Sequence, residues 1–523
     1  MSSVKRWSGT ISVAVAVCAV AALLARPWSS SEAPTVSYNG PKFNDMRKHA
    51  MCTTLAGVLP DSVYSEQHPV FGGFMGNYWS NNAAEVIPAC IVQPVDAHEV
   101  AAAVVVLQDH FDADGDARFA VRSGGHSPEA GFAGVADGVV IDMSLIDEVT
   151  VDQDRQSTMI GVGARWRDVY SKLDAMGLAM VGGRNANVGV GGLVLGGGIS
   201  FFSPRFGMVC DNIDKYEVVL ANGSIVEATA HQHADIWQAL KGGSGNFGIV
   251  TRVTTKIFPS GKIWAGYGYW LDWQTPKVIK AFFDFNKPES FDAYAGGPIM
   301  ALAYVRDLGI RMTVTNLSYS RPVSWAPVFA AFKSIWRLWS TTKVQSLTDA
   351  TTELHGMAPV GQRQFQVTTT IKNDLATFEA FNQIFTEQLK KVKPVKRSMW
   401  SLVFQPLSAA VTRKGSPNVL GMETRYANDT LIIVLLCVSW RDAKDDEIVH
   451  RVSRDVIRLG SEYAEERGTS DPYVYLNYAA SGQDVFSGYG FKNEKLMQDV
   501  RLAYDPTGLF QQAKQGGFKL AGS

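Results

Sequence analysis

The sequence of 523 residues is poor in cysteine, in net charge and in long apolar runs. Its five cysteines form no C-x-x-C pair and no Cys/His cluster, so we predict no metal site. The 49 Lys and Arg residues balance the 50 Asp and Glu residues without a basic block, so no nucleic-acid partner is expected. With 46% hydrophobic residues, the chain can still form two or three cores.

The longest apolar stretch near the N-terminus is Ile11–Ala25, which follows Lys5 and Arg6. It is too short to span a bilayer comfortably, and small residues with a Pro/Ser-rich stretch follow it. This favours a cleaved signal peptide within residues 1–31 over a signal anchor. We therefore expect a protein secreted or held in the secretory-pathway lumen, without a stable membrane anchor.

If the protein is secreted, Cys52 and Cys90 are the cysteines that we would pair in a disulfide. The alternative is that all cysteines are small buried hydrophobic residues, which is equally reasonable for Cys210 and Cys437.

Three sequons, at Asn222, Asn316 and Asn428, are candidates for N-glycosylation. Asn222-Gly223 has a second reading, because an Asn-Gly pair between two strand-like runs is typical of a type I′ hairpin turn.

Periodicity divides the chain into a lead-in (residues 32–86), a first domain (87–258), a second domain (259–470) and a C-terminal segment (471–523). In the first domain, Asp96 and Glu99 predict the capped start of a helix near Ala97, and Gly177 predicts the end of a helix that begins at Trp166. The second domain alternates strand-like runs with amphipathic helices, which indicates an antiparallel sheet covered by helices. The fold class expected is α+β.

The 48 glycines cluster near residues 124–138, 182–198 and 242–248, where backbone can turn tightly or approach a ligand. Gly243–Gly248 fits G-x-G-x-x-G, but a helix is predicted before it and a strand after it. A nicotinamide-dinucleotide site needs the reverse order, so we reject that interpretation.

The segment Arg122–Ser127, RSGGHS, follows a predicted strand directly. Its consecutive glycines can turn backbone N–H groups toward one anion, although a tight turn with a surface histidine is the plain alternative. The second glycine run, Val188–Gly198, favours the first reading, because two separate glycine loops suit a long cofactor.

These blocks, together with GSGNFGIVT, YLNY and YDPTGLF in the same order, resemble the vanillyl-alcohol oxidase / p-cresol methylhydroxylase flavoprotein superfamily. Within it, the chain is similar to the fungal-type, berberine-bridge-enzyme-like FAD-linked oxidases. The resemblance runs from Pro88 to Pro259 and resumes over Tyr475–Phe510. It implies a two-part FAD-binding domain of the PCMH type and an α+β substrate domain whose antiparallel sheet covers the flavin.

The resemblance also implies a role for each motif residue. His126 would carry FAD through a single 8α-histidyl bond, because Asn185 replaces the cysteine that makes a second bond in many relatives. Val188 stands at a position associated with oxygen access, and valine there resembles the oxidases. The remaining residues implied to contact the cofactor are Arg122, Ser123, Gly124, Gly125, Ser127, Gly189, Gly191, Gly192, Gly197, Gly248, Ile249, Val250 and Asn477.

The resemblance implies that the C-terminal segment returns to the FAD domain with a catalytic strand, on which Tyr475 is the base or polarising group that faces the flavin. Aromatic packing is an alternative for this residue. As a base, its phenol would need a lowered pKa or a basic neighbour. Gln405 would line the substrate pocket. The function implied is an oxidase that passes hydride from a small organic molecule, of the kind of a secondary-metabolite intermediate, to FAD and the electrons on to oxygen. A sugar or alcohol oxidase and a flavin-dependent cyclase or isomerase without net oxidation are the alternatives.

Overall fold

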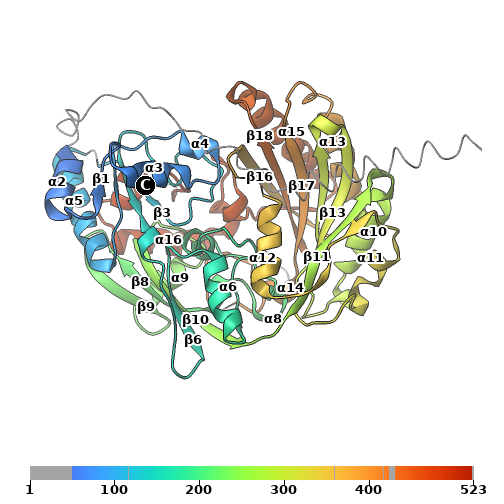
Figure 1. Cartoon of the computed structure of the whole chain (residues 1–523), viewed down its shortest axis with the longest axis horizontal. Helices are drawn as coiled ribbons and strands as arrows, with labels where there is room; N and C mark the ends of the chain where they lie inside the picture. The colour runs from blue at the N-terminus through green and yellow to red at the C-terminus, as the bar shows by residue number, and fades with distance from the viewer. Residues whose placement is uncertain (1–49, 116, 359, 416, 423–429, 521–523) are drawn as a thin grey trace, which may run out of the picture.

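The computed structural model describes residues 50–115, 117–358, 360–415, 417–422 and 430–520. These residues form three β-sheets arranged in two parts. The two smaller sheets lie together on the left of Figure 1, and the largest sheet lies on the right with helices on its outer face. The predicted signal peptide lies outside the described residues. No helix among the described residues is both long and apolar enough to cross a membrane.

The first sheet contains the strand that precedes the segment Arg122–Ser127, which we call the histidine loop. Its order is β1 (Val63–Tyr64), β2 (Cys90–Val92), β4 (Val139–Asp142) and β3 (Phe119–Arg122). β2, β4 and β3 are parallel, while β1 pairs antiparallel with β2. β2 and β4 are buried throughout, as expected for parallel strands covered on both faces.

Helix α5 (Ala97–Asp114) connects β2 to β3 and begins where the sequence predicts. The Asp96 carboxylate accepts hydrogen bonds from the N–H groups of His98 and Glu99. The Glu99 carboxylate reaches the N–H of Val95 instead of the N-cap N–H, so the capping box is shifted by one residue.

The second sheet is antiparallel and is centred on the long strand β10. Its members are β5 (Val149–Val151), β6 (Ser157–Gly161), β10 (Ile249–Pro259), β8 (Ile213–Val219), β9 (Ile225–Thr229) and β7 (Leu178–Met180). β8 and β9 form the expected hairpin, but its turn is not type I′. Only Gly223 has a positive φ, +78°, and the Gly223 N–H donates to the Leu220 carbonyl. The turn is therefore a three-residue loop with glycine in the left-handed position.

The third sheet is antiparallel and makes up most of the second domain. Its strands are β14 (Trp339–Ser340), β11 (Ile263–Leu271), β13 (Ile310–Tyr319), β12 (Ile299–Val305), β17 (Met399–Leu407), β18 (Leu431–Trp440), β16 (Arg363–Lys372), β19 (Ser470–Asp471) and β15 (Lys343–Gln345). Leu402 and Phe404 pack into the core beneath the helices of the second domain. Leu407 belongs instead to the core of the part that contains the two smaller sheets. Since strand side chains alternate, odd-numbered residues of β17 face that part.

The helices cover the sheets on both sides of the molecule. α10 (Thr275–Phe285), α13 (Leu375–Gln388) and α15 (Asp446–Glu466) pack on the outer face of the third sheet (Figure 1). α12 (Leu347–Gly356) joins the two parts, because Thr348 donates two hydrogen bonds to Asp174 of α6. The remaining helices are α2 (Ala50–Val58), α3 (Pro69–Gly76), α4 (Asn81–Ala84), α6 (Trp166–Ala175), α7 (Val190–Leu195), α8 (Ser203–Phe206), α9 (Ala234–Ala239), α11 (Ala330–Ser334), α14 (Ala409–Thr412) and α16 (Phe491–Tyr504).

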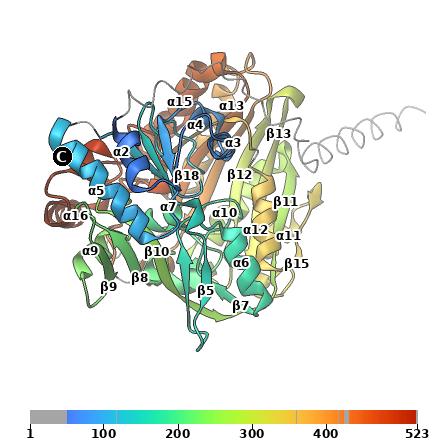
Figure 2. The same ribbon diagram turned by 60° about the vertical axis from the view of Figure 1, so that its left-hand side comes forward.

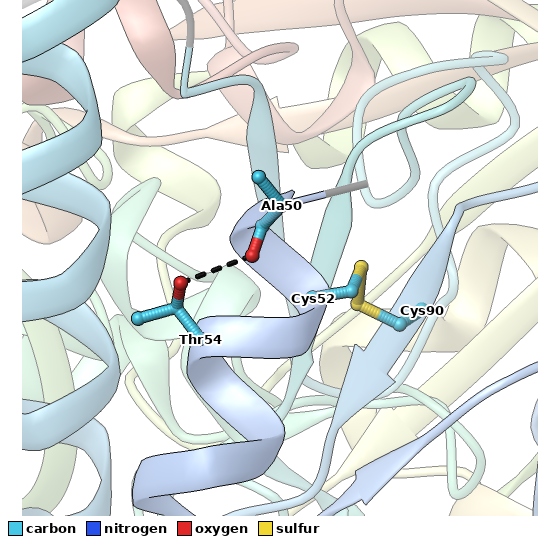
Figure 3. Close-up of a disulfide and its surroundings, with 4 residues drawn as sticks. All are labelled: Ala50, Cys52, Thr54 and Cys90. Atoms are coloured by element: carbon cyan, nitrogen blue, oxygen red, sulfur yellow. Dashed lines mark hydrogen bonds between the residues drawn. A yellow bond between two sulfur atoms is a disulfide. The ribbon is translucent and has the colours of Figure 1, made fainter. Parts of the chain in front are cut away.

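Residues 50–86, expected as a lead-in, pack against the first domain. Figure 2 shows α2 beside α5, and β1 extends the first sheet. The predicted disulfide is present: the sulfur atoms of Cys52 and Cys90 are bonded, joining α2 to β2 (Figure 3). At the other end, the chain returns to this domain, where Phe119 of β3 pairs with Lys514.

Candidate FAD site

The two glycine loops meet backbone to backbone. A Cβ atom on Gly124 would lie 2.5 Å from the backbone nitrogen of Gly189, and one on Gly189 would lie 2.3 Å from that of Gly124. Neither contact tolerates a side chain, because backbone atoms on both sides cannot move aside as a flexible side chain could. The histidine loop and the second glycine run therefore form one continuous surface of backbone.

Ser123 fixes the position of these loops relative to the second sheet. Its hydroxyl donates to the Val162 carbonyl at 2.6 Å and accepts from the Gly191 N–H at 3.2 Å. The Val162 N–H in turn donates to the carbonyl of Thr251 in β10. Through these bonds β10 supports the loops, although Gly248, Ile249 and Val250 themselves lie against β8 or in the core.

Arg122 is held by two aromatic residues of the N-terminal region. Its Nη1 donates to the Phe74 carbonyl at 2.7 Å, and its guanidinium stacks between the rings of Phe74 and Tyr78. A Cβ on Gly125, whose φ is +62°, would lie 2.9 Å from Arg122 Nε. Arg122 therefore packs against the loop, and its contact with the cofactor stays a prediction.

His126 lies at the end of this loop with its ring stacked on Trp79, the centroids 4.4 Å apart. Its Nε2 atom is buried without a hydrogen-bond partner among the described residues. Burial, with smaller contributions from His355 and Arg165, lowers the pKa of His126 to about 3. The imidazole is consequently neutral at physiological pH, which leaves a nitrogen lone pair available for bonding.

Trp79, Arg165 and His355 were not anticipated from the sequence. His355 comes from α12 of the second domain, and its Nδ1 is also buried without a partner among the described residues. Burial, with smaller contributions from Arg165 and Arg167, lowers the pKa of His355 as well. No motif signals these three residues, because each lies far from His126 in the sequence.

Tyr475 begins a single 3₁₀ turn, Leu476–Tyr478, and not the strand that we expected. Its side chain is 2% exposed, and its hydroxyl accepts a hydrogen bond from Asn477 Nδ2 at 3.1 Å. Asn477 Nδ2 also donates to the Leu193 carbonyl, which joins this turn to the second glycine run. Burial raises the pKa of Tyr475 well above its usual value, so the phenol is protonated at neutral pH.

Gln405 of β17 meets two residues that come from distant segments of the chain. Arg184 Nη2 donates to Gln405 Oε1 at 2.7 Å and to the Tyr478 hydroxyl at 3.0 Å. The Tyr478 hydroxyl donates to Gln405 Oε1 at 3.1 Å, and its ring packs edge-on against Tyr475 with centroids 4.9 Å apart. Arg184 and Gln405 line a cavity of about 260 Å³ between the two parts of the molecule.

The other predicted residues lie as follows. Ser127 accepts from the Glu129 N–H within its own turn, and Val188 is half-buried directly before Gly189. Gly192 is exposed, and Gly197, with φ of +101°, lies against Met208 and Leu420.

The three sequons differ in accessibility. Asn222 is exposed, whereas Asn316 is 4% exposed within β13, which is paired on both sides. The structure therefore argues against glycosylation of Asn316, because a transferase cannot reach an asparagine buried in a sheet. Asn428 lies outside the described residues.

The matching family model and the curated relative FUP4 both name FAD. Residues 88–229 match the model of the FAD binding domain. The FAD-dependent monooxygenase FUP4 of Fusarium proliferatum is 33% identical over 478 residues, covering 87% of this chain and 90% of the relative. The 6-hydroxy-D-nicotine oxidase of Arthrobacter nicotinovorans has a similar fold, with a TM-score of 0.71 and 19% identity over 88% of this chain and 98% of that one.

A grass pollen allergen with glucose dehydrogenase activity, Phl p 4, shares the fold too. Its TM-score is 0.69 at 18% identity, and the match covers 90% of this chain and 100% of the allergen. The described residues fit FAD: a backbone surface without Cβ atoms, an unpaired neutral imidazole at its end, and a buried phenol on the turn held against it.

Proposed function

Because this chain belongs to the family of FAD-linked oxidoreductases with a berberine-bridge-enzyme-like fold, we propose that it is an FAD-linked oxidase of a small organic substrate. The substrate loses a hydride and a proton, and molecular oxygen takes up the two electrons and two protons as hydrogen peroxide. The unpartnered Nε2 of His126, beside the contact of Gly124 with Gly189, is the observation that carries this proposal.

The covalent bond to FAD is proposed for His126 alone. A neutral imidazole can act as a nucleophile, and burial holds this ring in the neutral form. Stacking on Trp79 fixes the plane of the ring, and Asn185 offers no sulfur for a second bond. When bound, FAD would supply the two-electron chemistry by accepting hydride and returning electrons to oxygen.

Tyr475 is proposed to polarise the substrate, and not to act as a resting base. Its oxygen accepts from Asn477, so its own proton is free to be donated to a substrate oxygen. The raised pKa keeps that proton in place at neutral pH. Asn477 holds the phenol in position while its second bond, to the Leu193 carbonyl, ties it to the glycine run.

Oxygen as the electron acceptor is supported by Val188, at the position linked to oxygen access in the family. Two variants of Phl p 4 illustrate how such a choice can depend on one side chain. The variant with a single Asn-to-His substitution is a glucose dehydrogenase, and the variant that also replaces an isoleucine by valine is a glucose oxidase.

The relative FUP4 is named an FAD-dependent monooxygenase, and this favours monooxygenation as a second candidate function, in which one atom of O2 enters the product. The two functions are separated by isotope-labelled oxygen. An oxidase places the label in hydrogen peroxide in a one-to-one ratio with product, whereas a monooxygenase places it in the product itself. A cyclase or isomerase would consume no oxygen.

The test of the proposed function begins with the absorbance of the acid-denatured protein. A yellow precipitate, and a tryptic peptide containing His126 with the mass of FAD added, would support the covalent bond. An oxygen electrode with candidate alcohols, sugars and secondary-metabolite intermediates then identifies the donor. A colourless precipitate or an unmodified peptide would overturn the proposal of covalent attachment.

Secretion is proposed on two grounds: the apolar stretch Ile11–Ala25, and the Cys52–Cys90 disulfide, which needs an oxidising compartment to persist. Asn222 and Asn428 remain the proposed glycosylation sites.

A further inference from the structure

Arg184 is a buried cation without a carboxylate partner among the described residues. It is 9% exposed, and its hydrogen bonds go to two neutral groups, Gln405 Oε1 and the Tyr478 hydroxyl. Burying a charge is costly unless an opposite charge compensates it, and buried arginines are normally paired. Both bonds use Nη2, so the remaining guanidinium donors are left for another acceptor.

Gln405 adds a second unsatisfied donor at the same place. A guanidinium can only donate, so the oxygen of the Gln405 amide must face Arg184. The amide nitrogen then points elsewhere, and it is buried without a partner among the described residues. The Gln405 side chain is 2% exposed, so water in bulk does not satisfy this nitrogen.

Both residues line the same cavity, whose other walls are mainly apolar. The cavity of about 260 Å³ is bounded by side chains including Ile199, Phe285, Leu407 and Val411. Lys287 and Arg413 add positive charge to its lining, and Asp292 is the one acidic residue among the described lining residues. Surplus donors at one end and apolar walls around them suit a compact amphipathic molecule with an anionic end.

We propose that this cavity binds the substrate of the enzyme through a carboxylate, which takes a charge-assisted hydrogen bond from the Arg184 guanidinium and a second bond from Gln405 Nε2. A carboxylate matches the planar fork of an arginine and accepts two parallel bonds. The inference rests on the proposed function and deepens it, since the Tyr478 hydroxyl, which bonds to both Arg184 and Gln405, lies on the same turn as Tyr475.

The experiment measures binding of benzoate and of its neutral analogue benzamide to the purified full-length holoprotein by isothermal titration calorimetry. We expect benzoate to bind at least about tenfold more tightly than benzamide, because only benzoate compensates the charge of Arg184. Arg184→Met should weaken benzoate about tenfold or more and leave benzamide unchanged. Gln405→Glu should do the same, because the new carboxylate occupies the guanidinium in place of the ligand.

Two controls keep the result interpretable. Arg184→Lys retains the charge without the fork and should fall between wild type and Arg184→Met, even if the methionine variant folds poorly. Lys495→Gln, at an exposed lysine of α16 outside the cavity lining, tests whether loss of any positive charge weakens binding, and should change benzoate affinity less than about threefold. Thermal melting of each variant checks its folding.

Equal affinity for benzoate and benzamide, no benzoate binding, or unchanged benzoate binding in both Arg184 variants would overturn the inference. These outcomes are separate from failure of the proposed function. Flavin content and peroxide formation are measured on the same preparation, and a protein that binds benzoate through Arg184 but yields no peroxide would refute only the oxidase proposal.

Discussion

The two sides of the proposed site are formed by different kinds of atoms, backbone atoms on one side and side chains on the other. The side that fits FAD is backbone, where Gly124 and Gly189 approach so closely that neither tolerates a Cβ atom. The side that fits the substrate consists of side chains, where Arg184, Gln405 and Tyr478 converge by hydrogen bonds. A backbone surface suits a cofactor that is the same throughout a family, whereas side chains can change with the substrate.

This contrast has consequences for substitutions. A change on the cofactor side should remove the flavin or destabilise the fold, because the backbone there has no alternative arrangement. A change on the substrate side should leave the flavin bound and alter turnover or affinity. The predictions below run from the largest expected effect to the smallest, and each separates these two kinds of result.

His126→Ala is expected to abolish covalent attachment, because it removes the Nε2 atom to which the bond is proposed. The measurement is the visible absorbance of acid-precipitated protein together with the mass of the tryptic peptide. His98→Ala, at an exposed position of α5, is the control and should retain full flavin content. Covalent flavin in the His126→Ala protein would place the bond at another residue.

Removing the disulfide with Cys52→Ala and Cys90→Ala should reduce the free energy of unfolding by about 4 kcal/mol, since the bond closes a loop with a sequence separation of 38 residues. The measurement is denaturant unfolding, with Cys437→Ala as the control that removes a free thiol. Turnover of the folded enzyme should not change, because the disulfide supports α2 and β2 and touches no substrate residue. An unchanged unfolding midpoint would contradict the prediction.

Gly189→Ala should cost about 3 kcal/mol of stability and prevent flavin incorporation, because the added methyl group meets the Gly124 backbone. Gly261→Ala is the matched control: a Cβ there has nothing within 4 Å, so stability should change by less than about 0.5 kcal/mol. Both quantities are read from urea unfolding and from the flavin-to-protein absorbance ratio. Normal flavin loading of Gly189→Ala would show that the loops can separate.

The contrast also explains which parts of the molecule were predictable from the sequence. A backbone contact demands glycine at fixed positions, so RSGGHS and the second glycine run are visible as motifs. The helix that begins after Asp96 and the Cys52–Cys90 pair were likewise predictable from local signals. The role of Arg184 was not predictable, because its partners Gln405 and Tyr478 stand 221 and 294 positions away in the sequence. An arginine beside a glycine run does not by itself indicate a binding residue.

Arg122 and Tyr475 show which properties of a motif residue the motif itself does not predict. Arg122 belongs to the loop motif, yet its guanidinium is held between two aromatic rings supplied by residues 74 and 78, which carry no motif. The resemblance implies a role for Tyr475, but the pKa of its phenol depends on burial, and burial is a property of the whole fold. The contacts and the pKa of a side chain therefore could not be predicted from the motif and became visible only in the structure.

Tyr475→Phe is expected to reduce kcat about a hundredfold while leaving flavin content unchanged, because it removes one hydrogen-bond donor to the reacting group. The pH dependence gives a sharper test of the donor role. Burial raises the pKa of Tyr475, so the phenol stays protonated until the pH exceeds its usual value of about 10, and activity that needs the proton should be lost only above that pH. Profiles of kcat/KM for wild type and Tyr475→Phe should therefore coincide in shape between about pH 7 and pH 9. A wild-type profile that rises with an apparent pKa in this range, and becomes flat in Tyr475→Phe, would instead make the phenolate a base and show that the bound cofactor or substrate lowers its pKa.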